Sequence, residues 1–464
     1  MLFDTPVYFL FLAVVVSVYW LLGWRAQNRF LFGASCFFYG WWDWRFLLLM
    51  LASATIDYLL AQKIADSPSP ARRRSYFVFS LIVNFTVLGF FKYFGFFVHS
   101  FADGLASVGV HSVSLPLLEF ILPPGISFYT FQEVAYIVDV YRRRLEPSRR
   151  FVDYGLFISL FPHLIAGPIQ RPGHLLPQVQ KPRLFAGDKF FAGLMLILLG
   201  LFRKCVIADN AANISNAAFD GKLGHNFLAT AVGILAFALQ IYGDFSAYSD
   251  IARGSAQLLG FHFMVNFRQP YLASSLQDFW RRWHISLSTW LRDYLYFSLG
   301  GSRLGEAKTY RNLITTMLLG GLWHGANWTF VFWGGLHGCG LAIERLFRRS
   351  EPTPGFRPLG WLLTMTIVGL SWLFFRARNL SQALTMLADL AAWEWRASFS
   401  PILGYLAALA LITLALDLCL ELRQEEYPFE NARPEMALAT AVVFCALITV
   451  LGAMEMNAFI YFQF

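Results

Sequence analysis

The histidine in the run GLWHGANW (321–328) is the side chain whose type and surroundings point most directly to chemistry. His324 lies deep in an apolar run, and an ionisable residue inside a membrane segment marks a candidate functional site. Because an imidazole titrates near neutral pH, it can take a proton from a hydroxyl group as a general base. Asn327 would share a face with His324 on one helix and could orient the ring. By position alone, a buried histidine that only hydrogen-bonds to a neighbouring helix is an equal alternative.

A second candidate is the stretch DFWRRWHISLSTWLRDYLYFSLGGSR (278–303), which combines aromatic and basic side chains. Ser275 followed by Asp278 has the pattern of a capping box, so we expect a helix to begin there. Steps of three and four residues place one largely aromatic stripe on one face of this helix and charged residues on the other. The stripe contains Trp280, Trp283, Leu287, Trp290 and Tyr294, and the charged face contains Asp278, Arg281, Arg282, Arg292 and Asp293.

This predicted helix has two interpretations. It could lie in the membrane interface, with its tryptophans at headgroup level and its arginines among anionic lipids. Arginine pairs also hold phosphates through bidentate hydrogen bonds, so the charged face could bind a phosphorylated cofactor from the cytosol. His284 lies at the edge of the aromatic stripe and not among the arginines, so we expect it to face protein.

The other polar residues within apolar runs have structural interpretations that compete with functional ones. His337 is thirteen residues beyond His324, about 220° around a straight helix, so a packing role is favoured. His163 lies in a proline-broken run (161–174), where it could line a cavity or satisfy free carbonyl groups. Charged side chains in apolar runs should pair with one another or line a polar cavity. They are Asp57, Lys92, Glu133, Asp139, Arg203, Lys204, Asp244 and Asp250.

The composition limits the class of protein. Of 464 residues, 57% are hydrophobic and 14% are charged, whereas a soluble domain has about a quarter charged residues. Continuous apolar runs therefore indicate an all-α polytopic membrane protein, and they exclude disorder and a barrel of alternating strands. The net charge of +8 comes largely from arginine clusters, which are typical of cytoplasmic loops, so we expect no nucleic-acid partner. The five cysteines form no CxxC pair and no HExxH occurs, so we expect neither a metal site nor a disulfide framework.

The apolar runs predict ten to twelve membrane segments. Residues 6–24 can span a bilayer, which takes about 20 residues, and the arginines after them place the N-terminus outside. Residues 161–174 have basic residues on both sides and are expected to be re-entrant, and residues 263–311 are expected in the cytoplasm. The remaining runs are 30–42, 46–62, 75–98, 117–140, 189–208, 226–248, 312–347, 358–375, 400–421 and 436–454.

Six motifs together resemble the membrane-bound O-acyltransferase family, in particular the branch that includes the membrane subunit of bacterial alginate O-acetylation. The resemblance runs from about residue 6 to 380. Its motifs are LPPGISFYTFQ, IVDVYR, FPHLIAGPIQR, DFSAYSDIARG, QPYLASSLQDFWRRWHISLSTWLRDYLYFSLGG and YRNLITTMLLGGLWHGANW. The last two motifs are the most specific.

The resemblance implies a helical bundle around a transmembrane tunnel, with re-entrant and amphipathic cytoplasmic helices. We expect a single integral membrane domain over residues 1–464, with the acyltransferase core at about 75–347. Helices at 6–62 would precede this core, and helices at 358–454 would follow it. The family's essential histidine corresponds to His324, and His284 matches a second polar position that supports it.

The resemblance further implies that acetyl-CoA enters from the cytoplasm as the acyl donor and that no metal takes part. The acetyl group would pass outward to hydroxyls of an exported polysaccharide, with a periplasmic SGNH-type acyltransferase as partner, in a bacterial inner membrane. Substrate or tunnel positions are expected at Trp323, Asn327, Trp328, His163, Tyr129 and Gln132. Cofactor binding is expected at Arg281, Arg282, Arg292, Asp278 and Tyr294.

Two alternatives stay open at this point. The first is a glycan or lipid transporter or flippase without catalysis, although no internal repeat of the transporter kind is visible in the sequence. The second keeps the acyl transfer but replaces the donor with a D-alanyl carrier protein or a long acyl chain. The glycan could be alginate, cellulose, peptidoglycan or another surface polysaccharide.

Overall fold

The computed structural model describes residues 1, 3–109, 121–347, 357–428, 430–431, 434–453 and 457–460. Within these ranges the chain forms helices and connecting loops and contains no β-strand. Among the described residues, six helices are long and apolar enough to cross a membrane, and two shorter apolar helices accompany them. The six are Trp44–Asp66, Pro70–Ser107, Gly187–Phe219, Phe227–Leu258, Pro358–Arg376 and Phe399–Arg423, and the two shorter ones are Pro6–Tyr19 and Glu435–Leu451.

This number is smaller than the ten to twelve segments predicted from apolar runs. The run 312–347 is one reason, because it folds as two helices that are interrupted at Gly325. The helix that contains the run 30–42 has only 17 residues and carries Arg25, Gln27 and Asn28 in its first turns. The all-helical class with several membrane helices is confirmed, and the predicted tunnel is not tested by these helices.

The chain forms two compact units. The first, here called the N-terminal unit, contains Met1–Gly187 and Ala256–Phe263, and the second, the C-terminal unit, contains Asp188–Ser255 and Met264–Phe464. The expected organisation as a single integral membrane domain with a core at about 75–347 stays a prediction.

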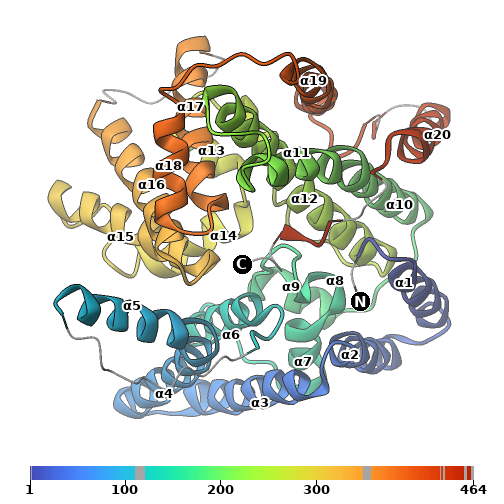
Figure 1. Ribbon diagram of the computed structural model, residues 1–464. Helices are drawn as coiled ribbons and strands as arrows, with labels where there is room; N and C mark the ends of the chain where they lie inside the picture. Colours follow the sequence, from blue (N-terminus) through green and yellow to red (C-terminus); the bar gives the residue numbers. More distant parts are fainter. Residues whose placement is uncertain are drawn as a thin grey trace. The chain divides into compact units, whose positions relative to one another are not determined.

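The N-terminal unit is built from helices whose starting points are encoded locally (Figure 1). Thr5, Asp43 and Ser69 each accept a backbone N–H from the first turn of the helix that follows, which is the usual role of an N-cap. The elements are α1 (Pro6–Tyr19), α2 (Trp24–Gly40), α3 (Trp44–Asp66), α4 (Pro70–Leu88), η1 (Gly89–Tyr93), α5 (Phe94–Ser107), α6 (Ile126–Tyr141), α7 (Phe151–Ser159), α8 (Phe161–Leu164) and α9 (Pro172–Val179).

Polar contacts tie α3 to α4 and α6 inside this unit. Asp57 accepts hydrogen bonds from Ser80 Oγ at 2.5 Å and from Asn84 Nδ2 at 2.7 Å. One turn earlier on α3, Ser53 donates to Glu133 Oε2 at 2.6 Å. These acids therefore join helices through hydroxyl and amide donors, whereas the sequence favoured ion pairs between charged side chains as the contacts that fix helix packing.

The proline-broken run 161–174 forms no continuous helix. It contains the four-residue α8 and the start of α9, separated by residues 165–171, and its residues 161–164 are buried in protein. Gly125 lies against it with φ +73°, and a Cβ there would be 2.4 Å from the carbonyl oxygen of Leu164. Prolines prevent helix continuation, so this segment matches the predicted broken backbone, and its membrane topology stays a prediction.

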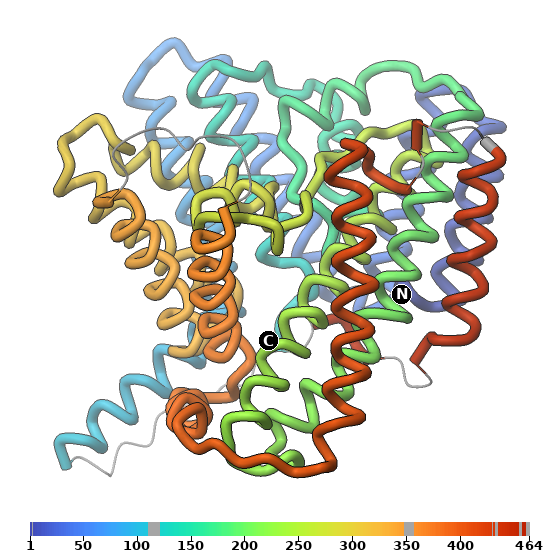
Figure 2. Tube along the Cα trace, turned by 90° about the horizontal axis from the view of Figure 1, so that it is seen from above, coloured from blue at the N-terminus to red at the C-terminus, as the bar shows by residue number. Residues whose placement is uncertain are grey.

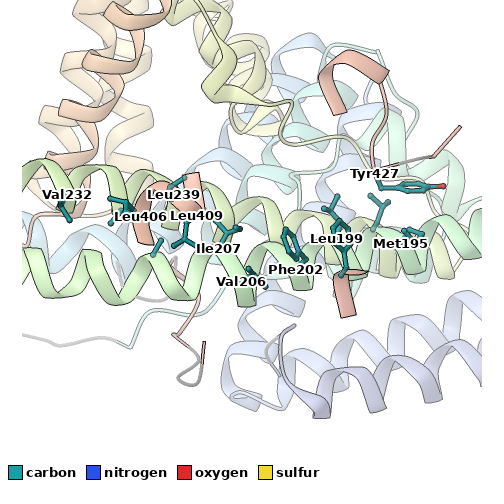
Figure 3. Close-up of a cluster of buried hydrophobic side chains, with 14 residues drawn as sticks. Met195, Leu199, Phe202, Val206, Ile207, Val232, Leu239, Leu406, Leu409 and Tyr427 are labelled. Atoms are coloured by element: carbon teal, nitrogen blue, oxygen red, sulfur yellow. The ribbon is translucent and has the colours of Figure 1, made fainter. Parts of the chain in front are cut away.

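The C-terminal unit carries the longer helices and most of the apolar core. A cluster of buried side chains joins α10, η2, α12, α19 and α20, and Figure 3 shows ten of them labelled. Figure 2 shows α12 and α19 side by side, and Figure 3 shows Leu239 close to Leu406 and Leu409 within this cluster. The elements are α10 (Gly187–Phe202), η2 (Arg203–Ala208), α11 (Asp209–Phe219), α12 (Phe227–Leu258), η3 (Pro270–Leu272), α13 (Leu276–Arg282), α14 (Ile285–Trp290), η4 (Leu291–Tyr296), α15 (Glu306–His324), α16 (Trp328–Phe347), α17 (Pro358–Arg376), α18 (Leu380–Asp389), α19 (Phe399–Arg423) and α20 (Pro434–Leu451).

A π-helical turn, η2, interrupts the long helix from α10 to α11 and carries two basic residues. Lys204 Nζ lies 2.9 Å from Oδ1 of Asp209, five residues later, and 3.0 Å from Oδ1 of Asp244 on α12. Arg203 donates to Asp250 Oδ2 at 2.5 Å. The intramembrane charges of this unit thus pair with each other, which is the favoured expectation for such groups.

The helices α15 and α16 form an antiparallel hairpin whose backbones touch. A Cβ added to Gly321 would lie 2.2 Å from the carbonyl oxygen of Phe330, and one added to Gly334 would lie 2.3 Å from that of Met317. Small residues permit such close packing in membrane proteins. The glycine-rich run 320–340 therefore fixes the position of the end of α15, where His324 lies.

Candidate functional site

His284 lies at a sharp break between two short helices of the C-terminal unit. α13 ends at Arg282, His284 has the left-handed angles φ +41° and ψ +53°, and α14 begins at Ile285. The prediction of one amphipathic helix across 278–303 is therefore wrong beyond Arg282, because the chain reverses its backbone conformation at His284. The start of the predicted helix is confirmed, since Ser275 Oγ accepts the backbone N–H of Asp278 at 3.1 Å.

The break changes the place of the aromatic stripe. Trp283 is 2% exposed and Trp290 is 4% exposed, so both are packed inside protein and do not present their rings to lipid headgroups. The ring of Trp283 stacks on Phe279 with centroids 5.6 Å apart and lies 5.0 Å from Trp372 on α17. These aromatic rings form a wall of the C-terminal unit.

His284 itself is completely buried and surrounded by aromatic rings. Its ring centroid lies 4.6 Å from Phe245 on α12 and 6.0 Å from Trp323 on α15. Its Nδ1 lies 3.2 Å from Oδ1 of Asn266, and its Nε2 makes no hydrogen bond with any residue that the structure describes. Burial lowers the pKa of His284 from 6.5 to about 3, so the ring is neutral at physiological pH.

His324 is the last residue of α15 and lies beside His284. The two imidazole centroids are 6.3 Å apart. His324 is 5% exposed, and its ring lies 5.1 Å from Trp333 and 5.3 Å from Phe375, counted between centroids. The structure thus brings the two predicted histidines together in one aromatic enclosure, although 40 residues of sequence separate them.

Asn327 does not orient His324 as predicted. Helix α15 ends at His324, Gly325 is extended, and Asn327 precedes the next helix, where its Oδ1 accepts the N–H of Thr329 at 3.0 Å. Its Nδ2 donates to the carbonyl oxygen of Arg378 at 3.0 Å. The expectation of a shared helix face is therefore wrong, because it assumed a continuous helix through the glycine.

The two tryptophans of the motif have different surroundings. Trp323 is 3% exposed, and its ring lies beside both histidines, 5.1 Å from His324 and 6.0 Å from His284 between centroids. Trp328, the first residue of α16, is 49% exposed. Trp323 therefore packs on both histidines, and the contact of either tryptophan with a substrate stays a prediction.

His337 has the structural role that was favoured from its spacing. It is fully buried on α16, its Nδ1 accepts from Trp280 Nε1 at 3.3 Å, and its Nε2 lies 2.9 Å from Ser371 Oγ. Trp333 packs between the two histidines of this hairpin, 5.1 Å from His324 and 4.9 Å from His337. His337 thus supports the wall of the enclosure.

The arginines predicted to hold a cofactor differ in the ion pairs that they form with carboxylates of the protein. Arg282 donates to both oxygens of Glu421 at 3.0 Å and to Asp278 Oδ1 at 3.1 Å. Arg292 pairs with the adjacent Asp293 at 2.7 Å. Arg282 therefore has a structural role, because its guanidinium group is held by Glu421 and Asp278. Arg281 is exposed and forms no ion pair with the residues that the structure describes.

The last of the predicted cofactor residues, Tyr294, is on the π-helical turn η4, where it is partly exposed. Its ring lies 5.2 Å from that of Trp290. The residue shares its turn with Arg292 and Asp293, so it is at the same end of α14 as the Arg292 pair.

Three predicted tunnel residues lie in the N-terminal unit. Gln132 on α6 donates from Nε2 to Nδ1 of His163 at 3.0 Å, and both side chains are buried. The hydroxyl of Tyr129, one turn earlier on α6, is buried and makes no hydrogen bond in the part of the chain described. The structure joins Gln132 to His163 and gives Tyr129 no hydrogen bond to either of them, and contact of the three residues with a substrate stays a prediction.

Asn266 is a site residue that the sequence did not reveal. It lies in a loop 18 residues before His284, so no helical or strand spacing connects the two. Its buried amide contacts His284, Ser286 and Ser249. A lone polar side chain in the otherwise apolar stretch 263–267 is the only signal that the sequence offers.

Comparisons with known proteins agree with this site. A model of the membrane-bound O-acyltransferase family matches residues 142–387, which is more than half of the chain and includes both histidines. The probable alginate O-acetylase of Azotobacter vinelandii is 44% identical over 404 residues, covering 86% of this chain and 80% of that protein. The probable alginate O-acetylase of Pseudomonas putida is 38% identical over 100% of both chains.

A relative with a different named acceptor is similarly close. The peptidoglycan O-acetyltransferase of Helicobacter pylori is 38% identical over 422 residues, which cover 83% of this chain and 79% of that protein. Family match, apolar helices and near full-length similarity point to the same class of protein. The chain therefore belongs to the membrane-bound O-acyltransferase family and is a multi-pass membrane O-acyltransferase.

Proposed function

We propose that this protein transfers acetyl groups from acetyl-CoA toward hydroxyl groups of an exported polysaccharide. The observation that carries the proposal is the pair His284 and His324, buried in one aromatic enclosure with ring centroids 6.3 Å apart. The names of the relatives, alginate O-acetylases and a peptidoglycan O-acetyltransferase, support acetyl as the acyl group and a polysaccharide as the acceptor.

In this proposal His324 acts as the general base. It takes the proton of the acceptor hydroxyl while the hydroxyl oxygen attacks the thioester carbonyl carbon. The new C–O bond forms, the C–S bond breaks, and the proton passes from His324 to the leaving thiolate of CoA. The rings of Trp323, Trp333 and Phe375 around His324 exclude water, which limits hydrolysis of the thioester.

The proposed donor enters from the cytoplasmic side through a tunnel. Arg281 is available for the CoA phosphates because it is exposed, and Arg292 with Tyr294 is a second contact. Arg282 forms ion pairs with Asp278 and Glu421, and these pairs hold the chain in place in this region. The buried group of His163, Gln132 and Tyr129 is a candidate for another part of the path.

The proposed location is a bacterial inner membrane, with the N-terminus in the periplasm. The acetyl group leaves on the periplasmic side, where an SGNH-type acyltransferase is the proposed partner that delivers it to the glycan. The arginine clusters that follow apolar runs support this orientation.

The test is consumption of acetyl-CoA by the purified protein in lipid vesicles to which an acceptor polysaccharide is added, with release of free CoA as the readout. We expect His324→Ala to abolish the release above background. His225→Ala is the matched control, because this exposed histidine of the C-terminal unit pairs only with Asp389 at the surface, and it should keep wild-type activity.

Three results would contradict the proposal. Activity with a D-alanyl carrier protein or a long-chain acyl-CoA, but not with acetyl-CoA, would identify a different donor. Undiminished activity in His324→Ala would remove the general base. Movement of a glycan or lipid across the vesicle membrane without any CoA release would indicate a transporter.

A further inference from the structure

The turn at His284 is held by a single buried side chain, Asn266. The backbone carbonyl of Asn266 accepts the N–H of Ile285 at 2.9 Å, and its Oδ1 accepts the N–H of Ser286 at 3.2 Å. Ser286 Oγ also donates to this Oδ1, at 2.9 Å. Because the first N–H groups of a helix have no partner within the helix, Asn266 acts as the cap of α14 from outside it.

Because Asn266 caps α14, the side chain of His284 does not cap this helix, although His284 is at its N-cap position. His284 is the residue before the first turn of α14, but its side chain makes no capping hydrogen bond. The amide of Asn266 is itself fixed, because its Nδ2 donates to Ser249 Oγ on α12 at 3.0 Å. Both Asn266 and Ser249 are 1% exposed, so water does not compete for these contacts.

The hydrogen bonds also determine which nitrogen of His284 carries the proton. A backbone N–H can only donate, so the atom of Asn266 that faces Ser286 N–H is the oxygen and not the amide nitrogen. The same oxygen lies 3.2 Å from Nδ1 of His284. Nδ1 must therefore be the protonated nitrogen that donates, and Nε2 keeps a free lone pair.

The free lone pair on Nε2 of His284 lies within the aromatic enclosure that also contains His324. No described residue donates to Nε2 of His284, although the atom is buried. The titratable side chain that contacts this ring is His324 from α15, and α12 and the loop before α13 contribute Phe245 and Phe267. A buried acceptor without a donor, beside the proposed base, is an arrangement that a substrate hydroxyl would complete.

We infer that Asn266 is a positioning residue that locks His284 in the tautomer protonated at Nδ1, so that Nε2 accepts a hydrogen bond from a second hydroxyl of the acceptor, next to the hydroxyl that His324 deprotonates. This inference rests on the proposed function. It assigns separate tasks to the two histidines: His284 holds the acceptor through the second hydroxyl, and His324 removes the proton of the attacking hydroxyl.

The test compares Asn266→Ala and Asn266→Asp with a matched control, Asn226→Ala. Asn226 is also a buried asparagine that caps a helix, since its Oδ1 accepts the N–H of Ala229 at 2.9 Å near the start of α12. Asn266→Ala should lower kcat for acetyl-CoA consumption by about 10–100-fold with little change in KM, as is typical when a supporting contact of a functional group is lost. Asn226→Ala should lower the melting temperature similarly and leave kcat unchanged.

Asn266→Asp provides the rescue. Its carboxylate still accepts from Nδ1–H and Ser286 N–H, so it should keep more activity than Asn266→Ala. The added negative charge raises the pKa of His284, so the acid limb of the kcat/KM profile should move to higher pH. A merely structural asparagine would produce no such shift.

A second readout is independent of the donor. In protein labelled with ¹⁵N-histidine, nuclear magnetic resonance identifies the protonated ring nitrogen, and the signals lost in His284→Gln belong to His284. We expect the proton on Nδ1 in the wild type and a mixture of tautomers in Asn266→Ala. A proton on Nε2 in the wild type, or full kcat in Asn266→Ala, overturns the inference, whereas a correct tautomer without acetyl-CoA consumption overturns only the proposed function.

Discussion

Replacing Gly334 by alanine tests how much the close packing of α15 against α16 contributes to the stability and the activity of the protein. The added Cβ would lie 2.3 Å from the carbonyl oxygen of Met317 and 3.2 Å from the Cα of Leu318. Ordinary contact begins at 3.4 Å, so the two helices must move apart by about 1 Å. Both of these atoms belong to the backbone, which cannot rotate away as a side chain can.

The magnitude follows from two opposing terms. Overpacking of a well-packed site costs typically about 1–3 kcal/mol, and loss of the flexible glycine in a helix returns about 0.5–1 kcal/mol. We expect Gly334→Ala to lower the free energy of unfolding by about 1–2 kcal/mol. At Gly335 the added Cβ meets only Leu318 Cδ2 at 3.5 Å, so Gly335→Ala should be neutral or stabilising.

The same displacement reaches the site. Trp333, the residue before Gly334, packs on His324 with ring centroids 5.1 Å apart. A misplacement of about 1 Å can reduce an enzymatic rate by about 100-fold, so Gly334→Ala should lose activity to that extent.

The assay measures thermal unfolding and acetyl-CoA consumption for both variants in the same lipid. If Gly334→Ala were as stable and as active as Gly335→Ala, the backbone contact between α15 and α16 would not position His324, and the reasoning would be refuted.

Three further predictions concern contacts near the enclosure. Arg282→Lys loses the two-pronged bond to Glu421 and should cost about 0.5–1 kcal/mol in thermal unfolding; a large rise in KM for acetyl-CoA would instead make Arg282 a donor contact. Because burial holds the pKa of His284 at about 3 against 6.5 when unfolded, the unfolded state binds the extra proton, so stability is complete above pH 6.5 and declines as the pH falls toward 3. His284→Gln should flatten this decline in unfolding measured against pH, and an unchanged slope would contradict the burial argument. Ser371→Val leaves the buried N–H of His337 without its oxygen and should cost about 1–3 kcal/mol in chemical unfolding, whereas a neutral effect would show that this bond is dispensable.

The class of fold could be predicted from the sequence because it depends on residue type, and residue type also made His324 a candidate, whereas His284 became one through the family resemblance. Apolar runs indicate membrane helices in any protein, and Ser275 marked the start of α13 by a purely local hydrogen bond. The shape of the chain at His284 could not be predicted, since three- and four-residue spacing continues through a residue whose backbone is left-handed. The stripe 280–294 therefore described one helix where the structure has two helices and a π-helical turn.

The partners of the site residues were the least predictable part. Asn266 meets His284 across a loop, a contact that tertiary folding creates and no periodicity records. Arg282 was predicted to bind phosphate because of its positive charge, but in the structure it forms an ion pair with Glu421, 139 residues later in the sequence. Asn327 was assigned to His324 by helical spacing, and Gly325 ends that helix. Residue type thus identified candidates, and only the fold decided which atoms they meet.

The π-helical turn η2 has a consequence for how this chain can be aligned with its relatives. Lys204 and Asp209 are five residues apart, and the extra residue of the turn is what places them on one side of the helix. Deleting one residue from Arg203–Ala208 would restore the α-helical repeat and rotate α11 by about 100° about its axis. In a relative with a one-residue gap at this point, the lysine would lose the carboxylate that corresponds to Asp209 and keep the one that corresponds to Asp244 on α12. Such a gap would therefore distinguish relatives in which this lysine has one carboxylate partner from those in which it has two.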